Sequence, residues 1–146
     1  MLSKDILIRK ATKEDYEVLM VLYNEFVGEN RYSKHSFDSF HAVITNSSNR
    51  IFVANDNGKL VGFATVSFRR VVRYPKIIAE LDELFVSGDI RKKGIGKLLM
   101  NAVIAESKKK DCYRLFIESG YAQKDAHIFY EKIGFTNYGY HFIKNL

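Results

Sequence analysis

The sequence predicts one α/β (α+β) domain over residues 1–146, with a single central mixed, mostly antiparallel sheet of about six to seven strands flanked by about four helices. The order of the apolar patterns predicts this class: a strand, two helices, a run of three strands, and then strands alternating with helices. No repeat, low-complexity tract or linker interrupts that order. Hydrophobic residues make up 47% of the chain, which is enough for one core.

The N-terminal third is predicted to form one strand and two helices. Residues 6–10 alternate in polarity as a strand does. Thr12 is a candidate helix N-cap, with Asp15 three residues later. The helix that follows carries apolar residues at helical spacing, at Tyr16, Leu19, Met20, Tyr23 and Phe26/Val27. A second short helix begins at Ser36, with one apolar face formed by Phe37, Phe40, Val43 and Ile44.

The remaining elements follow from turn signals and periodicity. Residues 51–55 and 59–68 form a hairpin around Asp56-Asn57-Gly58, because Asn-Gly supplies the positive φ angles of a tight turn. A second strand pair is predicted at 69–76 and 77–86, with Pro75 at its turn. The last predicted elements are a central helix from Gly94 to about Lys110, a strand at 114–119, a helix at 125–133, and short strands near 135–138 and 141–144.

Composition limits the class of partner. The net charge of +6 suits an anionic partner such as nucleic acid, a membrane surface or a phosphorylated cofactor. No apolar run approaches 18 residues, and residues 1–10 lack the apolar stretch of a signal peptide, so neither a membrane span nor secretion is expected. Cys112 is the only cysteine, which favours a cytoplasmic setting and a structural rather than catalytic thiol.

The junction between the strand at 77–86 and the central helix is an expected anion site. Arg91, Lys92 and Lys93 precede Gly94 and Gly96 where helical N–H groups have no internal partner. The spacing fits neither G-x-x-x-x-G-K-[ST] nor G-x-G-x-x-G. It fits [R/Q]-x-x-G-x-G, although a solvated basic loop is the alternative interpretation.

This loop, the acidic strand AELDELFV before it and the later segment DAHIFYEKIGF together resemble the GNAT-type N-acetyltransferase family and its acetyltransferase fold. The resemblance implies acetyl-CoA as co-substrate. Its pantetheine arm would run along Leu84, Phe85 and Val86, and its thiol end would lie near Ala126, Phe129 and Tyr130. Its pyrophosphate would lie on the backbone of the loop residues Arg91, Lys92, Lys93, Gly94, Ile95, Gly96 and Lys97. No metal is expected, because the four histidines are scattered.

Acetyl transfer to an amine needs a base for the incoming ammonium and an acid for the leaving thiolate. Glu80 and Asp82 share a face of a regular strand, and Glu83 points to the other face unless a bulge intervenes. Family members use an acid at either position. Glu80 is the favoured base and Asp82 the ligand of the substrate ammonium, but the sequence leaves the two roles open. The resemblance makes Tyr130 the acid. A solvent-facing carboxylate edge and a packed tyrosine are the structural alternatives.

The acceptor is less defined. The motifs resemble small-amine branches such as aminoalkylphosphonate and aminoglycoside N-acetyltransferases, so a small amine is expected. Arg69, Arg70 and Arg73 either bind an anionic group of that acceptor or are surface charge, and the role of His127 is open. One alternative is acetylation of a protein N-terminus or lysine. Another is a nucleic-acid-binding module that uses the basic loop, which the acidic strand disfavours. A homodimer is an expectation from the family alone.

Overall fold

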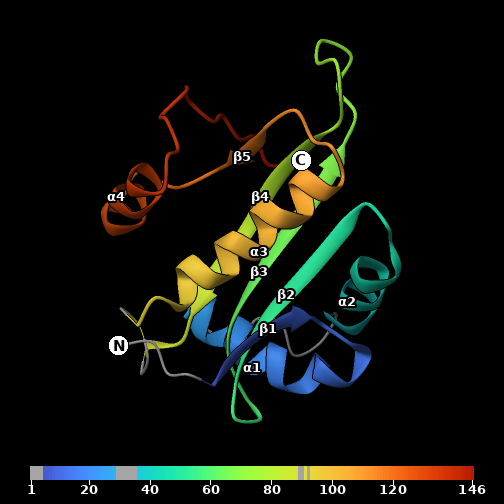
Figure 1. Ribbon diagram of the computed structural model, residues 1–146, viewed down its shortest axis with the longest axis vertical. Helices are drawn as coiled ribbons and strands as arrows, with labels where there is room; N and C mark the ends of the chain where they lie inside the picture. Colours follow the sequence, from blue (N-terminus) through green and yellow to red (C-terminus); the bar gives the residue numbers. More distant parts are fainter. Residues whose placement is uncertain (1–4, 29–35, 89–90, 92) are drawn as a thin grey trace. The chain divides into compact units, whose positions relative to one another are not determined.

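A five-stranded sheet in the order β1-β2-β3-β4-β5 organises the chain (Figure 1). The computed structural model describes residues 5–28, 36–88, 91 and 93–146, and its contacts divide the chain into two compact units, 1–116 and 117–146. The strands are β1 (Ile6–Lys10), β2 (Asn49–Asp56), β3 (Lys59–Arg69), β4 (Ile78–Val86) and β5 (Leu115–Ile117). The helices are α1 (Tyr16–Val27), α2 (Ser36–Thr45), α3 (Ile95–Lys109) and α4 (Lys124–Lys132), with a 3-10 turn at Lys13–Asp15.

Antiparallel pairing of β1 to β4 follows from local turn chemistry. Asn57 and Gly58 adopt φ angles of 51° and 91°, which closes the two-residue turn between β2 and β3. Gly28 ends α1 at a φ of 75°. β1 to β4 therefore form one antiparallel meander, which confirms the predicted mixed α/β class and the four helices.

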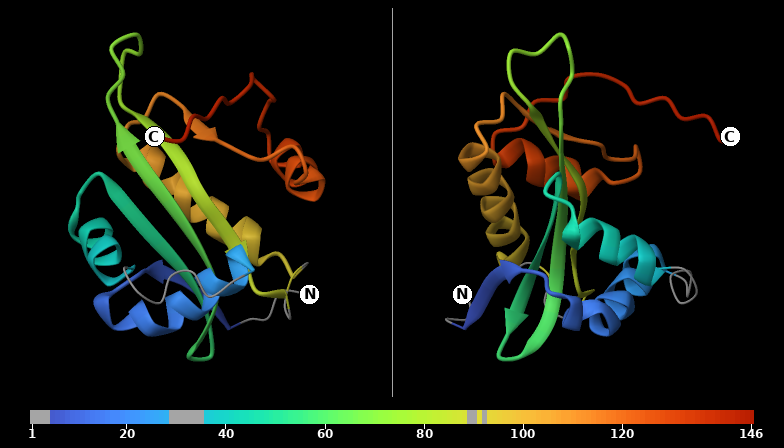
Figure 2. Two further views of the ribbon diagram at one scale, coloured as in Figure 1. Left: turned by 180° about the vertical axis from the view of Figure 1, so that it is seen from behind. Right: turned by 90° about the vertical axis from the view of Figure 1, so that its right-hand side faces the viewer.

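The two faces of the sheet carry different helices (Figure 2). Successive side chains of β3 point to opposite faces. The ring of Phe63 stacks on Tyr23 of α1, with centroids 4.3 Å apart. Its neighbour Gly62 lies against Leu99 of α3 instead. The sheet of the first unit thus has α1 and α2 on one face and α3 on the other.

Each face has its own apolar layer. On the α1 face, one buried cluster joins both helices to the sheet, through Leu19, Met20, Leu22, Phe40, Ile51, Val53, Leu60, Phe63 and Phe85. On the α3 face, the helix buries Ile95, Leu99, Met100 and Val103 completely or nearly so. The sheet is covered on both sides, so its central strands read as nearly continuous apolar runs.

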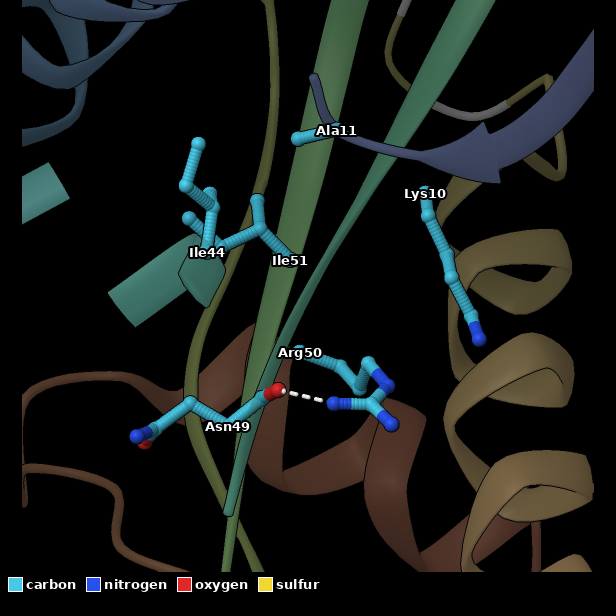
Figure 3. A pocket seen from close by; sticks show the side chains of 6 residues that line it. All are labelled: Lys10, Ala11, Ile44, Asn49, Arg50 and Ile51. Carbon is cyan, nitrogen blue, oxygen red and sulfur yellow. Dashed lines mark hydrogen bonds between the residues drawn. The ribbon is translucent and has the colours of Figure 1, made fainter. Parts of the chain in front are cut away.

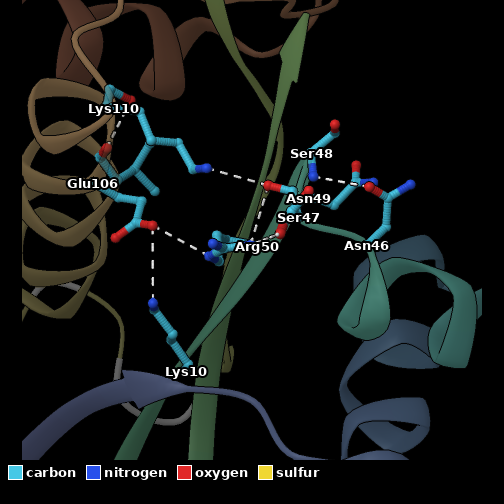
Figure 4. A network of polar contacts seen from close by, with 10 residues as sticks. Lys10, Asn46, Ser47, Ser48, Asn49, Arg50, Glu106 and Lys110 are labelled. Carbon is cyan, nitrogen blue, oxygen red and sulfur yellow. Dashed lines mark hydrogen bonds and ion pairs between the residues drawn. The ribbon is translucent and has the colours of Figure 1, made fainter.

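A buried carboxylate links α3 to two strands (Figure 4). Glu106 is 8% exposed, and its Oε1 lies 3.2 Å from Arg50 Nε of β2 and 3.8 Å from Lys10 Nζ of β1. A carboxylate buried to this extent needs such partners, because it has lost most of its contact with water. The network fixes the C-terminal half of α3 against the sheet.

A second carboxylate fixes the entry to α1. Asp15 receives two hydrogen bonds from the Arg9 guanidinium, both 2.8 Å long, and one of 2.7 Å from the backbone N–H of Thr12. The hydrogen bonds from Arg9 are the main cause that lowers the pKa of Asp15. The predicted partnership of Thr12 and Asp15 is therefore present, although a 3-10 turn separates it from α1.

Three of the predicted strands are absent. Residues 70–77 form a turn rather than a strand, because Pro75 cannot donate a ladder hydrogen bond and β3 already ends at Arg69. The segments 135–138 and 141–144 lie outside any strand. A segment becomes a strand only when another strand pairs with it. The sheet has five strands for this reason, below the six to seven expected.

Gly62 allows β3, β4 and α3 to approach one another closely. A Cβ at this position would lie 2.7 Å from the Phe85 carbonyl oxygen and 3.3 Å from Leu99 Cδ1. We predict that Gly62→Ala destabilises the fold by about 1–3 kcal/mol, which lowers Tm by roughly 3–10 °C. Thermal unfolding followed by circular dichroism measures this. Gly120→Ala is the control, because a Cβ there meets no atom within 4 Å. Equal Tm values for the two variants would contradict the prediction.

Candidate functional site

A bulge in β4 brings three carboxylates to one face of the sheet. Thr65 pairs with Glu83 and Val66 with Leu81, so Asp82 is an extra residue in the ladder. Glu80 is opposite Ser67, which lies on the same face of β3 as Thr65. Glu80 and Glu83 therefore both point to the α1 face. A strand without the bulge would have sent them to opposite faces.

Glu83 is held by two hydroxyl groups. Its Oε1 accepts a hydrogen bond of 2.7 Å from the Tyr23 hydroxyl of α1 and one of 2.8 Å from Thr65 Oγ1 of β3. The Tyr23 ring is itself fixed by its stack on Phe63. Two hydroxyl donors on one carboxylate oxygen hold the position of the Glu83 side chain.

Glu80 and Asp82 have different surroundings. Glu80 forms an ion pair with the Arg69 guanidinium, whose side chain is half exposed. Asp82 accepts a 3.2 Å hydrogen bond from Ser67 Oγ. The pKa of Asp82 is raised, first because neighbouring atoms partly shield its carboxyl from water and also because the charges of Glu80 and Glu83 lie nearby. The raised pKa makes the Asp82 carboxyl a better proton acceptor than an ordinary aspartate.

The sequence identified the cluster but not its orientation or its partners. The prediction that Glu83 faces away was made for a regular strand, and the bulge brings it to the same face as Glu80. Sequence analysis missed Tyr23, Thr65 and Ser67 as partners of the carboxylates. Thr65 and Ser67 could have been noticed in the sequence, because they are polar residues at alternate positions of an otherwise apolar strand.

After the glycine-rich loop, α3 begins at Ile95, one residue later than predicted. Gly94 is the N-cap residue, with φ at 80°, a conformation that favours glycine. Ile95 is 2% exposed and anchors the first turn, Gly96 is half-buried, and Lys93 and Lys97 are exposed. The N-terminus of a 15-residue helix thus follows a left-handed glycine, a geometry suited to anions. Lys92, the remaining predicted cation of the loop, lies outside the described residues.

Ser87, Gly88 and Arg91, which precede the two glycines of the loop, form hydrogen bonds with neighbouring elements. The Arg91 Nε donates a 2.9 Å hydrogen bond to the Val86 carbonyl, and its guanidinium lies 5.5 Å from the centre of the Phe85 ring. Glu25 of α1 accepts the backbone N–H of Gly88 at 2.9 Å and the Ser87 hydroxyl at 3.1 and 3.2 Å. The start of the loop is therefore held by α1 as well as by β4.

The predicted pantetheine strand is the C-terminal end of β4. Phe85 is buried in a ring cluster with Phe63 and Phe26, whereas Leu84 and Val86 are half-buried on the α3 face. Two backbone hydrogen bonds connect the start of β4 to the segment that precedes β5. They join Tyr113 N–H to the Ile77 carbonyl and Ala79 N–H to the Arg114 carbonyl, at 2.8 and 2.9 Å.

The remaining predicted site residues lie in the second unit, on α4. Tyr130 is half-buried, with its ring 5.6 Å from Phe129 and 6.0 Å from Phe135. Burial raises the pKa of the Tyr130 hydroxyl. The phenol is therefore protonated at neutral pH and able to donate. Ala126 and His127 are half-buried on the same helix.

One pocket of the first unit lies away from the carboxylates of β4. A pocket lined by Lys10, Ala11, Ile44, Asn49, Arg50 and Ile51 contains no predicted site residue (Figure 3). Its two cations are the partners of Glu106. Among the described residues, no group of three or more His, Cys, Asp or Glu is placed to hold a metal ion, and no helix is long and apolar enough to cross a membrane.

The opposite pKa shifts of Asp82 and Asp15 predict opposite effects of amidation. Ionising Asp82 costs more in the folded than in the unfolded chain, so stability falls as the pH rises from the unfolded pKa through the raised folded pKa. Asp82→Asn should raise Tm at pH 7, and the gain should vanish below about pH 3.

Asp15→Asn should lower Tm at pH 7, by an effect of about 1–3 kcal/mol, and this loss should shrink as the pH falls through the lowered pKa. Tm values measured from pH 3 to 8 test both signs; a destabilised Asp82→Asn at pH 7 would refute the first.

Comparison with known proteins places the chain in a family. Residues 12–135 match the Acetyltransferase (GNAT) family. An uncharacterized N-acetyltransferase of Methanocaldococcus jannaschii is 31% identical over 140 residues, which cover 92% of this chain and 62% of that relative, so the chain spans less than two thirds of its length. The aminoalkylphosphonate N-acetyltransferase of Salmonella typhimurium is 26% identical and is matched over 95% of this chain and 90% of its own.

A solved structure supports the same fold. An aminoglycoside N-acetyltransferase in complex with CoA superposes with a TM-score of 0.83 at 20% identity, covering 97% of this chain and 94% of that one. The family match spans the carboxylate strand, the glycine-rich loop and all of α4. The predicted family is therefore confirmed: the chain belongs to the GNAT acetyltransferase family and is an N-acetyltransferase of that fold.

Proposed function

We propose that the protein transfers the acetyl group of acetyl-CoA to a primary amine of a small molecule, by direct attack of the amine on the thioester. The observation that carries this proposal is the convergence of Glu80, Asp82 and Glu83 on one face of β4, immediately before the glycine-rich loop. An acidic face attracts and orients an ammonium group. A helix N-terminus attracts a pyrophosphate. The two halves of the reaction thus have adjacent binding elements.

The loop fits the co-substrate by its chemistry. Gly94 and Gly96 leave the backbone N–H groups of the first turn open to a close approach, and Lys93 and Lys97 add positive charge. Residues 84–86 offer strand backbone for the pantetheine arm. The assignment of Lys92, Ala126 and Phe129 to co-substrate binding rests on the family motif alone.

The proposed chemistry divides the proton transfers between two groups. Asp82 accepts a proton from the substrate ammonium, directly or through water, and the neutral amine then forms the new N–C bond as the C–S bond breaks. Tyr130 donates its proton to the departing sulfur. The contacts favour Asp82 over Glu80 as the base, because Glu80 is held in an ion pair with Arg69 whereas the pKa of Asp82 is raised. Glu80 and Glu83 then orient the ammonium. The role of Tyr130 comes from the family motif.

The acceptor is proposed as a small amine, as for the aminoalkylphosphonate relative. Arg69 is paired with Glu80, and Arg70 and Arg73 are exposed in the turn beyond it, so none of the three arginines is assigned to the acceptor. A cytoplasmic location and a homodimer complete the proposal. The exposed Tyr138, Tyr140 and Phe142 are a surface that a second copy would cover.

Co-substrate binding is tested at Gly94. We predict that the wild-type protein binds acetyl-CoA with a Kd on the order of micromolar, and that Gly94→Asp weakens it at least tenfold because a carboxylate there repels the pyrophosphate. Gly94→Asn is the matched control, since Asn and Asp have the same shape and both tolerate a positive φ. Isothermal titration calorimetry measures all three. No binding by the wild type, or equal loss in both variants, would refute the site.

Catalytic roles are tested by thiol release over a panel of amines that includes small aminophosphonates, aminoglycosides and a peptide with a free N-terminus and a lysine. Asp82→Asn and Tyr130→Phe should each lower kcat by roughly 10²–10⁴. Glu80→Gln and Glu83→Gln should mainly raise KM for the amine. The acid limb of the kcat/KM profile should disappear in Asp82→Asn. If Asp82→Asn retains activity and Glu80→Gln loses it, the two roles are reversed.

A further inference from the structure

A second basic surface lies at the end of the sheet where β3 turns into β4. The segments 69–77 and 108–116 each contain four Lys or Arg residues and together contain one acid, Asp111. The cations are Arg69, Arg70, Arg73, Lys76, Lys108, Lys109, Lys110 and Arg114. We call this the hairpin-end surface. The 15 residues of α3 separate it from the glycine-rich loop by about 22 Å along the helix axis.

Several contacts join the two segments into one surface. Lys76 Nζ forms a 2.7 Å ion pair with Asp111, and Tyr113 N–H donates to the Ile77 carbonyl. The Tyr74 ring lies 5.6 Å from that of Tyr113 and 6.0 Å from that of Phe116. The turn therefore lies beside the C-terminal end of α3 and the residues that follow it, so the cations of both segments belong to one surface.

Guanidinium groups and aromatic rings alternate on this surface. The Arg73 guanidinium lies 4.7 Å from the centre of the Tyr74 ring, and that of Arg114 lies 5.8 Å from Tyr74 and 5.1 Å from Tyr113. Arg73, Arg114 and Tyr113 are nevertheless exposed. A guanidinium that lies over a ring can still direct N–H donors toward a phosphate.

The fold explains only part of this charge. Lys108 and Lys109 complement the C-terminal dipole of α3, and Arg69 and Lys76 have carboxylate partners. No helix dipole or described carboxylate contact accounts for Arg70 and Arg73 at the exposed turn, where Val72 is completely exposed. The proposed co-substrate site lies at the other end of α3 and does not use them.

We propose that the hairpin-end surface binds single-stranded nucleic acid. Closely spaced cations match a chain of phosphates, and exposed tyrosine and guanidinium planes match unpaired bases, which stack on such groups without regard to sequence. An acidic peptide would use the charge but not the rings. The proposal is independent of the acetyl-transfer reaction.

Fluorescence anisotropy with a fluorescein-labelled mixed 20-nucleotide single strand, DNA or RNA, tests it on the full chain between 50 and 200 mM salt. Arg73→Glu/Arg114→Glu should weaken binding at least tenfold at 100 mM salt. The neutral pair Arg73→Gln/Arg114→Gln should reduce the slope of log K against log salt by about 1.4, the value for two lost phosphate contacts. Tyr113→Ala should weaken binding without changing that slope. Lys13→Glu/Lys59→Glu, at two exposed cations elsewhere, is the matched charge control and should have less than a threefold effect.

Because Arg114 packs on two rings, Arg70→Glu/Lys109→Glu provides a second pair at exposed positions, and this pair should weaken binding as the first does. Unchanged Tm and acetyl-CoA binding show that each variant is folded. The proposal fails if the oligonucleotide does not bind at 50 mM salt, if the control pair weakens binding equally, or if saturating acetyl-CoA displaces the strand. It also fails if a polyglutamate peptide binds as tightly as the oligonucleotide.

Discussion

The one extra residue in β4 is the constraint on which the arrangement of the site depends. Without it, Glu80 and Glu83 would lie on opposite faces, and one of them would face the apolar side chains of α3 with no partner. The bulge shifts the alternation between Leu81 and Glu83, so Leu81 remains buried at 2% exposure while both glutamates face α1. A local irregularity thus reconciles an apolar sheet with an acidic face.

This orientation makes α1 part of the site rather than a cover over the core. Tyr23 stacks on Phe63 and donates to Glu83, and Glu25, two residues later, accepts hydrogen bonds from Ser87 and Gly88. The same helix therefore contacts the carboxylate face and the start of the glycine-rich loop. A shift of α1 along its axis would disturb both sets of contacts at once. Its rigid attachment through Leu19 and Leu22 to the apolar cluster supports this precision.

Sequence reasoning worked where local chemistry decides the structure. Asn57-Gly58 identified the first hairpin, and Gly94 lies within one residue of the start of α3. The acidic strand and the loop were found as motifs, and the family match confirms the fold they implied. The orientation of Glu83 was beyond reach, because a bulge depends on the pairing of two strands rather than on β4 alone. Tyr23 is 60 residues away from Glu83 in the chain, so nothing local connects them. The C-terminal strands failed for the same reason, since their pattern is local but strand pairing is not.

The buried Glu106 has a consequence for the order in which the chain assembles during synthesis. Its partners Lys10 and Arg50 leave the ribosome first, and Arg50 is 56 residues ahead of the carboxylate. Until α3 has emerged, β1 and β2 carry two cations on the face that the helix will cover, with that carboxylate still missing. Emergence of α3 supplies the carboxylate that contacts both cations, so this part of the first unit can be completed only after residue 106 has been synthesised.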